Sequence, residues 1–138
     1  MMGRCAIHTY SKGQAVIALS SGEAEYYGLV SGVSQVLGAI SLAKDWGMCV
    51  RGHVWMDSTA GIAIGSRRGL GKVKHIDTVF LWIQEVVNAG RITVGKKDTT
   101  EMLADILTEP VGVATMTEML RGMEFHFTEG RHELSLRA

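Results

Sequence analysis

The sequence is poor in the features that mark membrane-spanning, secreted and zinc-binding proteins. It has no run of about 18 consecutive apolar residues, the length that a membrane span needs, and the segment Met1–Arg4 lacks the apolar part of a signal peptide. Cys5 and Cys49 match no zinc or redox spacing and form no disulfide framework. We therefore expect no membrane partner and an intracellular chain, cytoplasmic or nuclear, that is not secreted.

An excess of charge of one sign is also lacking. The 14 basic and 14 acidic residues cancel, so binding to a polyanion would need a local patch. The acids are unevenly spread, because residues 1–22 contain neither Asp nor Glu. At 138 residues the chain has the usual size of one compact domain. We expect that single domain over residues 1–123, followed by a weakly periodic tail or edge segment over residues 124–138.

Helix-like and strand-like stretches alternate along the chain, which predicts an α/β fold with helices flanking a sheet. In such folds the carboxyl ends of parallel strands face the ligand site. The expected elements are strands over 6–10 and 14–19, a helix from Ser20 to Gly47, a strand over 52–57, a short helix through Ile64, a glycine-rich basic loop over 65–74, a helix from about Ile76 to Gly90, a strand over 91–97, a helix over 98–110 ended by Pro110, and a helix from about Val113 to Met123.

Three acids lie inside apolar stretches that we assign to a helix, a strand and a helix. They are Glu25, Asp57 and Asp105. At about 100° per residue, Glu25 shares a helix face with Leu29, whereas Glu23 points to the opposite side. A buried carboxylate without a partner is costly, so acids in core-facing segments need a cation or a hydrogen-bond network. These three residues are therefore our candidate metal ligands.

The other acids near them have a structural explanation. Ser20 with Glu23 fits a capping box at the start of a helix, and Asp98 with Glu101 repeats the pattern. The same plain interpretation, as capped, solvated or salt-bridged acids, stays open for the three candidate ligands. If they do form a site, carboxylates without a histidine or cysteine cluster favour a hard cation such as Mg²⁺, and pairs of Mg²⁺ ions serve phosphodiester hydrolysis.

Four ordered sequence blocks resemble the ribonuclease H domain of copia-type retrotransposon polyproteins. Together they cover roughly residues 8 to 110, and four blocks in order are far more specific than any one of them. The blocks are Ala18-Leu19-Ser20-Ser21-Gly22-Glu23-Ala24-Glu25-Tyr26-Tyr27-Gly28-Leu29, then Met56-Asp57-Ser58 with Ala60, then Lys74-His75-Ile76-Asp77, then Leu103-Ala104-Asp105-Ile106-Leu107-Thr108.

The resemblance implies an endonuclease that cuts the RNA strand of an RNA–DNA hybrid with two Mg²⁺ or Mn²⁺ ions, beside reverse transcriptase and integrase modules. It matches Glu25, Asp57 and Asp105 to three of four catalytic carboxylates. The fourth is an Asp on the first, central strand, and residues 1–22 contain no acid that could replace it. We therefore expect a ribonuclease H-like mixed sheet that lacks its first strand, a domain incomplete at its N-terminus, and impaired catalysis.

Basic and aromatic residues offer candidate nucleic-acid contacts. A basic cluster could follow the phosphates of a hybrid, although a solvated basic loop has the same composition. Its members are Arg67, Arg68, Lys72, Lys74 and His75. Tryptophans can stack on bases, but on amphipathic elements they usually belong to the core, so we assign Trp46, Trp55 and Trp82 to no site.

Three functions remain open at this point. They are an active ribonuclease H, a non-catalytic remnant of the polyprotein that binds hybrids weakly, and a small α/β interaction module whose acids are structural. Of these, we favour the remnant for this chain. A missing central strand would leave unpaired strand edges, so we also expect self-association.

Overall fold

The computed structural model describes residues 1–15, 17–68 and 81–126. Its contacts divide the chain into two compact units, one formed by Lys12–Met102 and the other by Met1–Ser11 together with Leu103–Ala138. Each unit is described by itself. The single domain that we expect over residues 1–123 stays a prediction.

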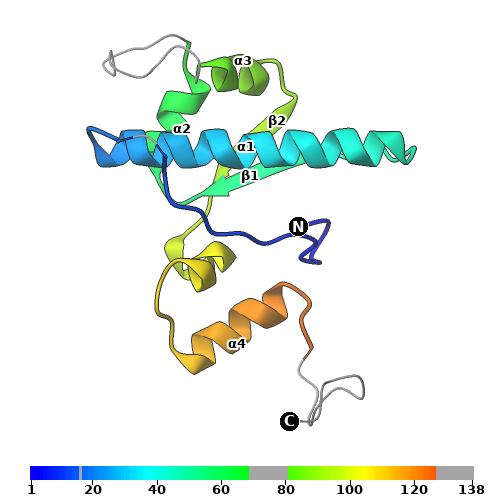
Figure 1. The fold of residues 1–138 in the computed structure, drawn as a ribbon, viewed down its shortest axis with the longest axis vertical. Coiled ribbons are helices and arrows are strands. Elements are labelled where there is room, and N and C mark those ends of the chain that lie inside the picture. The colour runs from blue at the N-terminus through cyan, green and yellow to red at the C-terminus, as the bar shows by residue number, and fades with distance from the viewer. Residues whose placement is uncertain (16, 69–80, 127–138) are drawn as a thin grey trace. The chain divides into compact units, whose positions relative to one another are not determined.

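Helix α1, Ser21–Asp45, is the longest element of the larger unit (Figure 1). It begins where predicted, because the Ser20 hydroxyl accepts a hydrogen bond from the Glu23 amide at 3.2 Å. The Glu23 carboxylate in turn accepts from the Leu19 amide and the Tyr27 hydroxyl, each at 2.8 Å. The cap by Ser20 is thus confirmed, whereas Glu23 reaches back to the Leu19 amide, one residue before the N-cap amide that the capping box predicts, and also accepts a hydrogen bond from within the helix.

Strands β1, Gly52–Met56, and β2, Ile92–Lys96, form a parallel two-stranded sheet. Their register pairs Gly52 with Ile92 and Met56 with Lys96. Along β1, Gly52 and Met56 are buried while His53 and Trp55 are exposed, which confirms the predicted alternation. Both strands lie within their predicted segments. The sequence-based assignment of Trp55 to the core was wrong, because 53% of its side chain is exposed on the open face of the sheet.

The core of this unit forms where α1 packs against the sheet and two further helices. These are α2, Thr59–Ser66, and α3, Trp82–Asn88. Helix α2 is capped by Ser58, whose hydroxyl accepts from the Gly61 amide at 3.2 Å. The expected helix start near Ile76 lies outside the described residues. The buried core residues are Tyr26, Leu29, Val30, Val33, Met56, Ile64, Ile83, Val86 and Ile92.

The length and composition of α1 would also allow it to cross a membrane, but a core helix of a globular domain passes the same test. Tyr26, Leu29 and Val33 of this helix are buried in the core just described. The apolar character of α1 is therefore explained by packing within the unit.

Three predicted elements are wrong. Residues 6–10 form no strand, and neither do the described residues between 14 and 19. Within residues 1–15, 17–68 and 81–126, no neighbouring strand supplies the hydrogen bonds that would hold either segment extended in a sheet. The helix expected over 98–110 is instead two short 3₁₀ turns, Thr99–Glu101 and Leu103–Leu107. Asp98 makes no side-chain cap there, and Met102 is extended, which interrupts the helix.

The smaller unit contains the 3₁₀ turn Leu103–Leu107 and helix α4, Val113–Gly122, as predicted for the latter. Arg4 and Glu124 form an ion pair at 3.0 Å within it, and the Ala6 amide donates to the Met123 carbonyl at 3.4 Å. Over the part of the chain that the structure describes, the fold is thus mixed α/β with a parallel sheet. The ribonuclease H-like arrangement of that sheet stays a prediction.

Candidate metal site and nucleic-acid surface

Glu25 and Asp57 come together at the carboxyl end of strand β1. Asp57 directly follows β1, and Glu25 lies near the start of α1. The first turn of α2 packs closely against this part of α1, because a Cβ added to Gly61 would lie 3.2 Å from the Glu25 Cβ and 2.8 Å from the Met56 Cε. A glycine at this position therefore permits the approach of α1 and α2 that holds the two acids near each other.

The electrostatics of the pair are those of two like charges. The pKa of Glu25 is raised from its ordinary value, first by partial desolvation and second by the negative charge of Asp57. Placing two carboxylates close enough to repel each other is unfavourable unless a cation or a proton compensates them. The binding of a cation by these two side chains stays a prediction.

The prediction that Glu25 faces the core was wrong. Glu25 is exposed, whereas on the same helix face Leu29 is buried and Val36 is half-buried. The neighbour of Glu25 on α2 is Gly61, which lies against the Glu25 Cβ and has no side chain that could cover the carboxylate. An exposed carboxylate remains available to a solvated ion.

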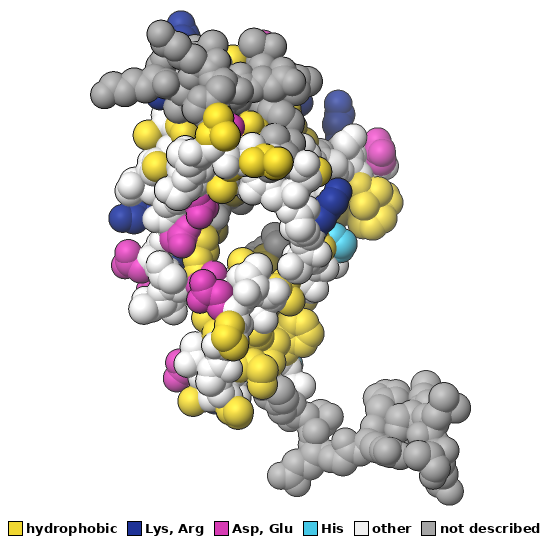
Figure 2. Space-filling view, turned by 60° about the vertical axis from the view of Figure 1, so that its left-hand side comes forward, with side chains coloured by type: hydrophobic (Ala, Val, Ile, Leu, Met, Phe, Trp, Pro, Cys, Tyr) yellow, Lys and Arg dark blue, Asp and Glu magenta, His cyan; other side chains and the backbone are white. Residues whose placement is uncertain are grey.

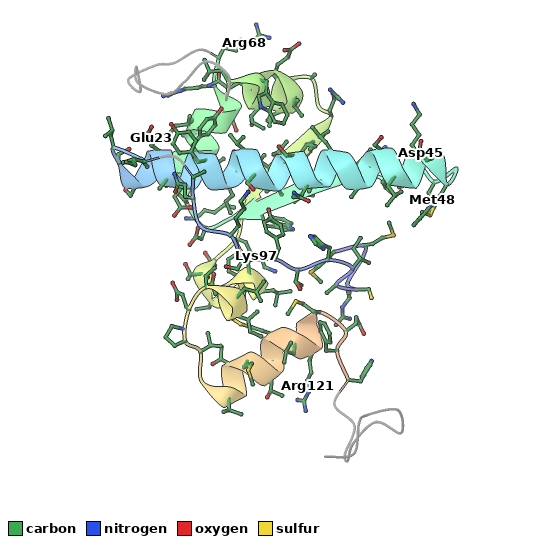
Figure 3. The ribbon with its side chains drawn as sticks, in the orientation of Figure 1. Glu23, Asp45, Met48, Arg68, Lys97 and Arg121 are labelled. Carbon is green, nitrogen blue, oxygen red and sulfur yellow. The ribbon has the colours of Figure 1, made fainter. Side chains whose placement is uncertain are left out.

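The buried acid at this end of α1 is Glu23, whose side chain is only 2% exposed. Figure 3 labels it near the start of the helix. Helical phase alone placed Glu23 opposite the core and missed its burial. The signal that could have found it is Tyr27 at i+4, which supplies a buried hydroxyl donor to a carboxylate already fixed by capping.

Asp105 belongs to the smaller unit, in the 3₁₀ turn Leu103–Leu107. Its backbone carbonyl accepts hydrogen bonds from the amides of Thr108 and Glu109 at 3.0 and 2.8 Å. Among the described residues, no group of three or more His, Cys, Asp or Glu side chains is close enough to hold a metal ion. The pairing of Asp105 with Glu25 and Asp57 stays a prediction.

The chemistry of the donors fits Mg²⁺ or Mn²⁺. Both ions prefer carboxylate oxygens, and Mg²⁺ is commonly held by one or two carboxylates together with water and substrate phosphate. Glu25 and Asp57 supply two such groups at a solvent-accessible position. A two-ion site would need further oxygen ligands, and occupancy of this position by Mg²⁺ or Mn²⁺ stays a prediction.

The two described members of the predicted basic cluster, Arg67 and Arg68, differ in their burial. Arg67 is half-buried and lies near Tyr26. Burial raises the pKa of the Tyr26 phenol to about 12, and the positive charge of Arg67 partly opposes this rise. Arg68 is exposed and lines a cavity of about 470 Å³ with Gln84 and Asn88 of α3. Figure 3 labels Arg68 where α2 ends. Lys72, Lys74 and His75 lie outside the described residues.

The chain is similar to part of a retrotransposon polyprotein. It is 32% identical over 108 residues to the retrovirus-related Pol polyprotein from transposon TNT 1-94 of Nicotiana tabacum, which covers 77% of this chain and 8% of that polyprotein. No family model and no solved structure matches the chain. The chain thus spans less than a tenth of the relative's length, and the similarity supports a retrotransposon Pol origin.

Proposed function

We propose that this chain is the ribonuclease H-like part of a copia-type retrotransposon Pol polyprotein and that its substrate is an RNA–DNA hybrid. The observation that carries the proposal is the approach of Glu25 and Asp57 at the carboxyl end of a parallel strand. Similarity to a Pol polyprotein supports it, because such a polyprotein supplies a context in which an RNA–DNA hybrid is a plausible substrate. The four sequence blocks point to ribonuclease H among its modules.

In this proposal Glu25 and Asp57 hold a divalent cation, Mg²⁺ or Mn²⁺. When bound, such an ion supplies Lewis acidity to a phosphoryl oxygen and lowers the pKa of a bound water. The two side chains come from different elements, α1 and the end of β1, and Gly61 of α2 lies close to both Glu25 and Met56, the residue before Asp57. Their role would be to hold the divalent cation where the scissile phosphate binds.

Of the two described members of the basic cluster, Arg68 is better suited than Arg67 to contact the phosphate backbone. It is exposed, whereas Arg67 beside it is half-buried near Tyr26. A basic side chain at the surface can contact the phosphates and so help to position a nucleic acid without reading its sequence. We assign Arg67 to the packing of Tyr26 and Arg68 to the hybrid.

Hybrid binding without cleavage is the second candidate function. It is favoured by the number of carboxylates that meet, because the described residues bring together two where the resemblance implies four. Two carboxylates can hold one cation and a phosphate, but a two-ion hydrolysis needs more ligands. This candidate corresponds to the impaired domain expected from the sequence.

The deciding experiment titrates Mg²⁺ or Mn²⁺ into the chain with a hybrid labelled on its RNA strand. Asp57→Asn removes one ligand, and Asp45→Asn is a matched control at an exposed acid near the other end of α1. Cation-dependent cleavage that Asp57→Asn abolishes and Asp45→Asn preserves establishes the nuclease. Cation-dependent binding without cleavage, lost in Asp57→Asn, establishes the second candidate. Absence of both cleavage and hybrid binding overturns the proposal.

A further inference from the structure

The exposed face of the sheet carries an aromatic side chain that is held in place without being buried. Trp55 is 53% exposed, yet its ring lies over β2 at Gly95, its partner in the register. A Cβ added to Gly95 would lie 2.7 Å from the Trp55 Cζ3, so the indole occupies the space that a side chain would take. The ring is therefore supported by the backbone of β2 while about half of the residue stays exposed to solvent.

A second contact fixes the indole from its side. The His53 ring lies with its centroid 4.0 Å from that of Trp55. His53 is held by a hydrogen bond of 2.6 Å between its Nδ1 and the Thr93 hydroxyl, which itself donates to the Gly52 carbonyl at 3.3 Å. This chain of contacts orders an exposed tryptophan before any ligand arrives, which reduces the entropy lost on binding.

Trp55 also lines a cavity of about 480 Å³ at the carboxyl end of the sheet, next to the candidate metal site. The Lys97 amide donates to the Met56 carbonyl at 2.8 Å, so Lys97 continues the ladder beside Asp57. Figure 3 labels Lys97 where the chain leaves β2. The side chains that line the cavity are Trp55, Lys96, Lys97, Asp98 and Glu101.

The lining combines three kinds of group. An open indole face stacks on a nucleobase, and two ammonium groups attract a phosphate. The carboxylates of Asp98 and Glu101 cancel the two positive charges, which is unsuited to a run of bare phosphates but suited to the N–H donors on the edge of a base. The volume lies within the range of small-ligand pockets.

We propose that this cavity binds an unpaired nucleotide in a single-stranded extension of the hybrid, with its base on Trp55 and its phosphate near Lys97. The base must be unpaired, because stacking on a side chain requires a base face that is not covered by its neighbours in a duplex. The inference rests on the proposed function, and it assigns to the chain a preference for hybrids that carry a single-stranded end.

The test compares binding of a blunt hybrid with that of the same hybrid carrying a short single-stranded extension, by fluorescence anisotropy without divalent cations. The expected result is tighter binding of the extended hybrid, with that gain reduced about tenfold in Trp55→Ala. Lys97→Ala should lower the salt slope of binding by about one unit. Trp46→Ala and Lys44→Ala are matched controls at exposed positions near the end of α1.

Trp55→Phe keeps an aromatic face and guards against misfolding of the alanine variant. It should retain most of the preference for the extension while losing the quenching of tryptophan fluorescence that stacking causes. Equal affinity for blunt and extended hybrids, or equal behaviour of Trp55→Ala and Trp46→Ala, overturns the inference and leaves the proposed function standing. Failure to bind either hybrid without divalent cations overturns the inference, and failure to bind in the Mg²⁺ or Mn²⁺ titration as well overturns the proposed function.

Discussion

The two units of the chain differ in how much core supports their acidic residues. In the larger unit, Glu25 and Asp57 lie at the ends of regular elements that enclose a continuous apolar core. In the smaller unit, Asp105 lies on a 3₁₀ turn with no buried residue, and the buried apolar side chains among its described residues are Met119 and Met123. The comparison teaches that a packed core fixes the position of a carboxylate more firmly than a local turn does.

Both units expose large hydrophobic side chains, but the larger unit buries many more of them than the described part of the smaller unit does. Figure 2 shows hydrophobic side chains among charged ones at the molecular surface. The exposed large hydrophobic residues include Ile17, Leu19 and Trp46 in the larger unit and Met1 and Ile7 in the smaller unit. In the larger unit such residues surround a core, whereas in the smaller unit few apolar side chains are buried. Local opening should therefore cost less in the smaller unit.

The largest expected effect comes from removing core volume. Ile83 is fully buried, so Ile83→Ala should lower the free energy of unfolding by about 2–5 kcal/mol. Hydrogen exchange followed by mass spectrometry should then quicken throughout residues 12–102. The matched variant Met119→Ala should quicken exchange in its own unit and spare α1. Identical exchange patterns in the two variants would show that the units unfold as one.

The next effect separates the two acids of α1. Glu23→Ala leaves the buried Tyr27 hydroxyl and the Leu19 amide without their acceptor, which should cost about 1–3 kcal/mol in urea unfolding. Glu25→Ala removes an exposed carboxylate and should cost little. If Glu25→Ala proved the more destabilising variant, the structural role assigned to Glu23 would be wrong.

A third variant tests the close packing beside the candidate site. Gly61→Ala inserts a Cβ against Glu25 and Met56 and should destabilise by about 1–3 kcal/mol through overpacking. Gly28→Ala in α1 meets no atom within 4 Å and should stabilise by about 0.5–1 kcal/mol through helix propensity. Thermal unfolding measures both. Stabilisation by Gly61→Ala would contradict the proposed approach of α1 and α2.

The smallest effect is the pH dependence of Glu25. Its pKa is raised in the folded state, so the folded chain binds more protons than the unfolded chain just above the ordinary value of 4.5. Stability should therefore fall, relative to Glu25→Gln, as the pH rises through this window. Denaturant unfolding at several pH values measures the difference. Added Mg²⁺ should remove it, and Asp57→Asn should reduce it.

Local chemistry explains how far the sequence predicted this structure. Ser20 and Glu23 cap α1 because an apolar helix follows and packs on the sheet, whereas Asp98 and Glu101 stand before a segment that turns again at Met102. The same residue pattern thus succeeded where tertiary packing supported a helix. Strand β1 was predictable from its alternation, because one face is buried and the other open.

The sequence indicated which residues belong to the candidate site, but it did not indicate how exposed those residues and their neighbours are. Asp57 followed from the end of a strand, but the exposure of Glu25 depended on Gly61, which is distant in the sequence. Trp55 was misassigned because nothing in the local sequence shows that its face of the sheet is open. Such features depend on contacts between elements, which periodicity does not record.

The most direct test of the central claim, that Glu25 and Asp57 bind a divalent cation, is paramagnetic broadening of amide signals by Mn²⁺ in nuclear magnetic resonance spectra. The account predicts selective broadening of residues beside Glu25 and Asp57, lost in Asp57→Asn and kept in Asp45→Asn. Broadening at Asp105 as well would join the smaller unit to the site. Equal broadening in wild type and Asp57→Asn, or broadening centred on other acids, would contradict the claim.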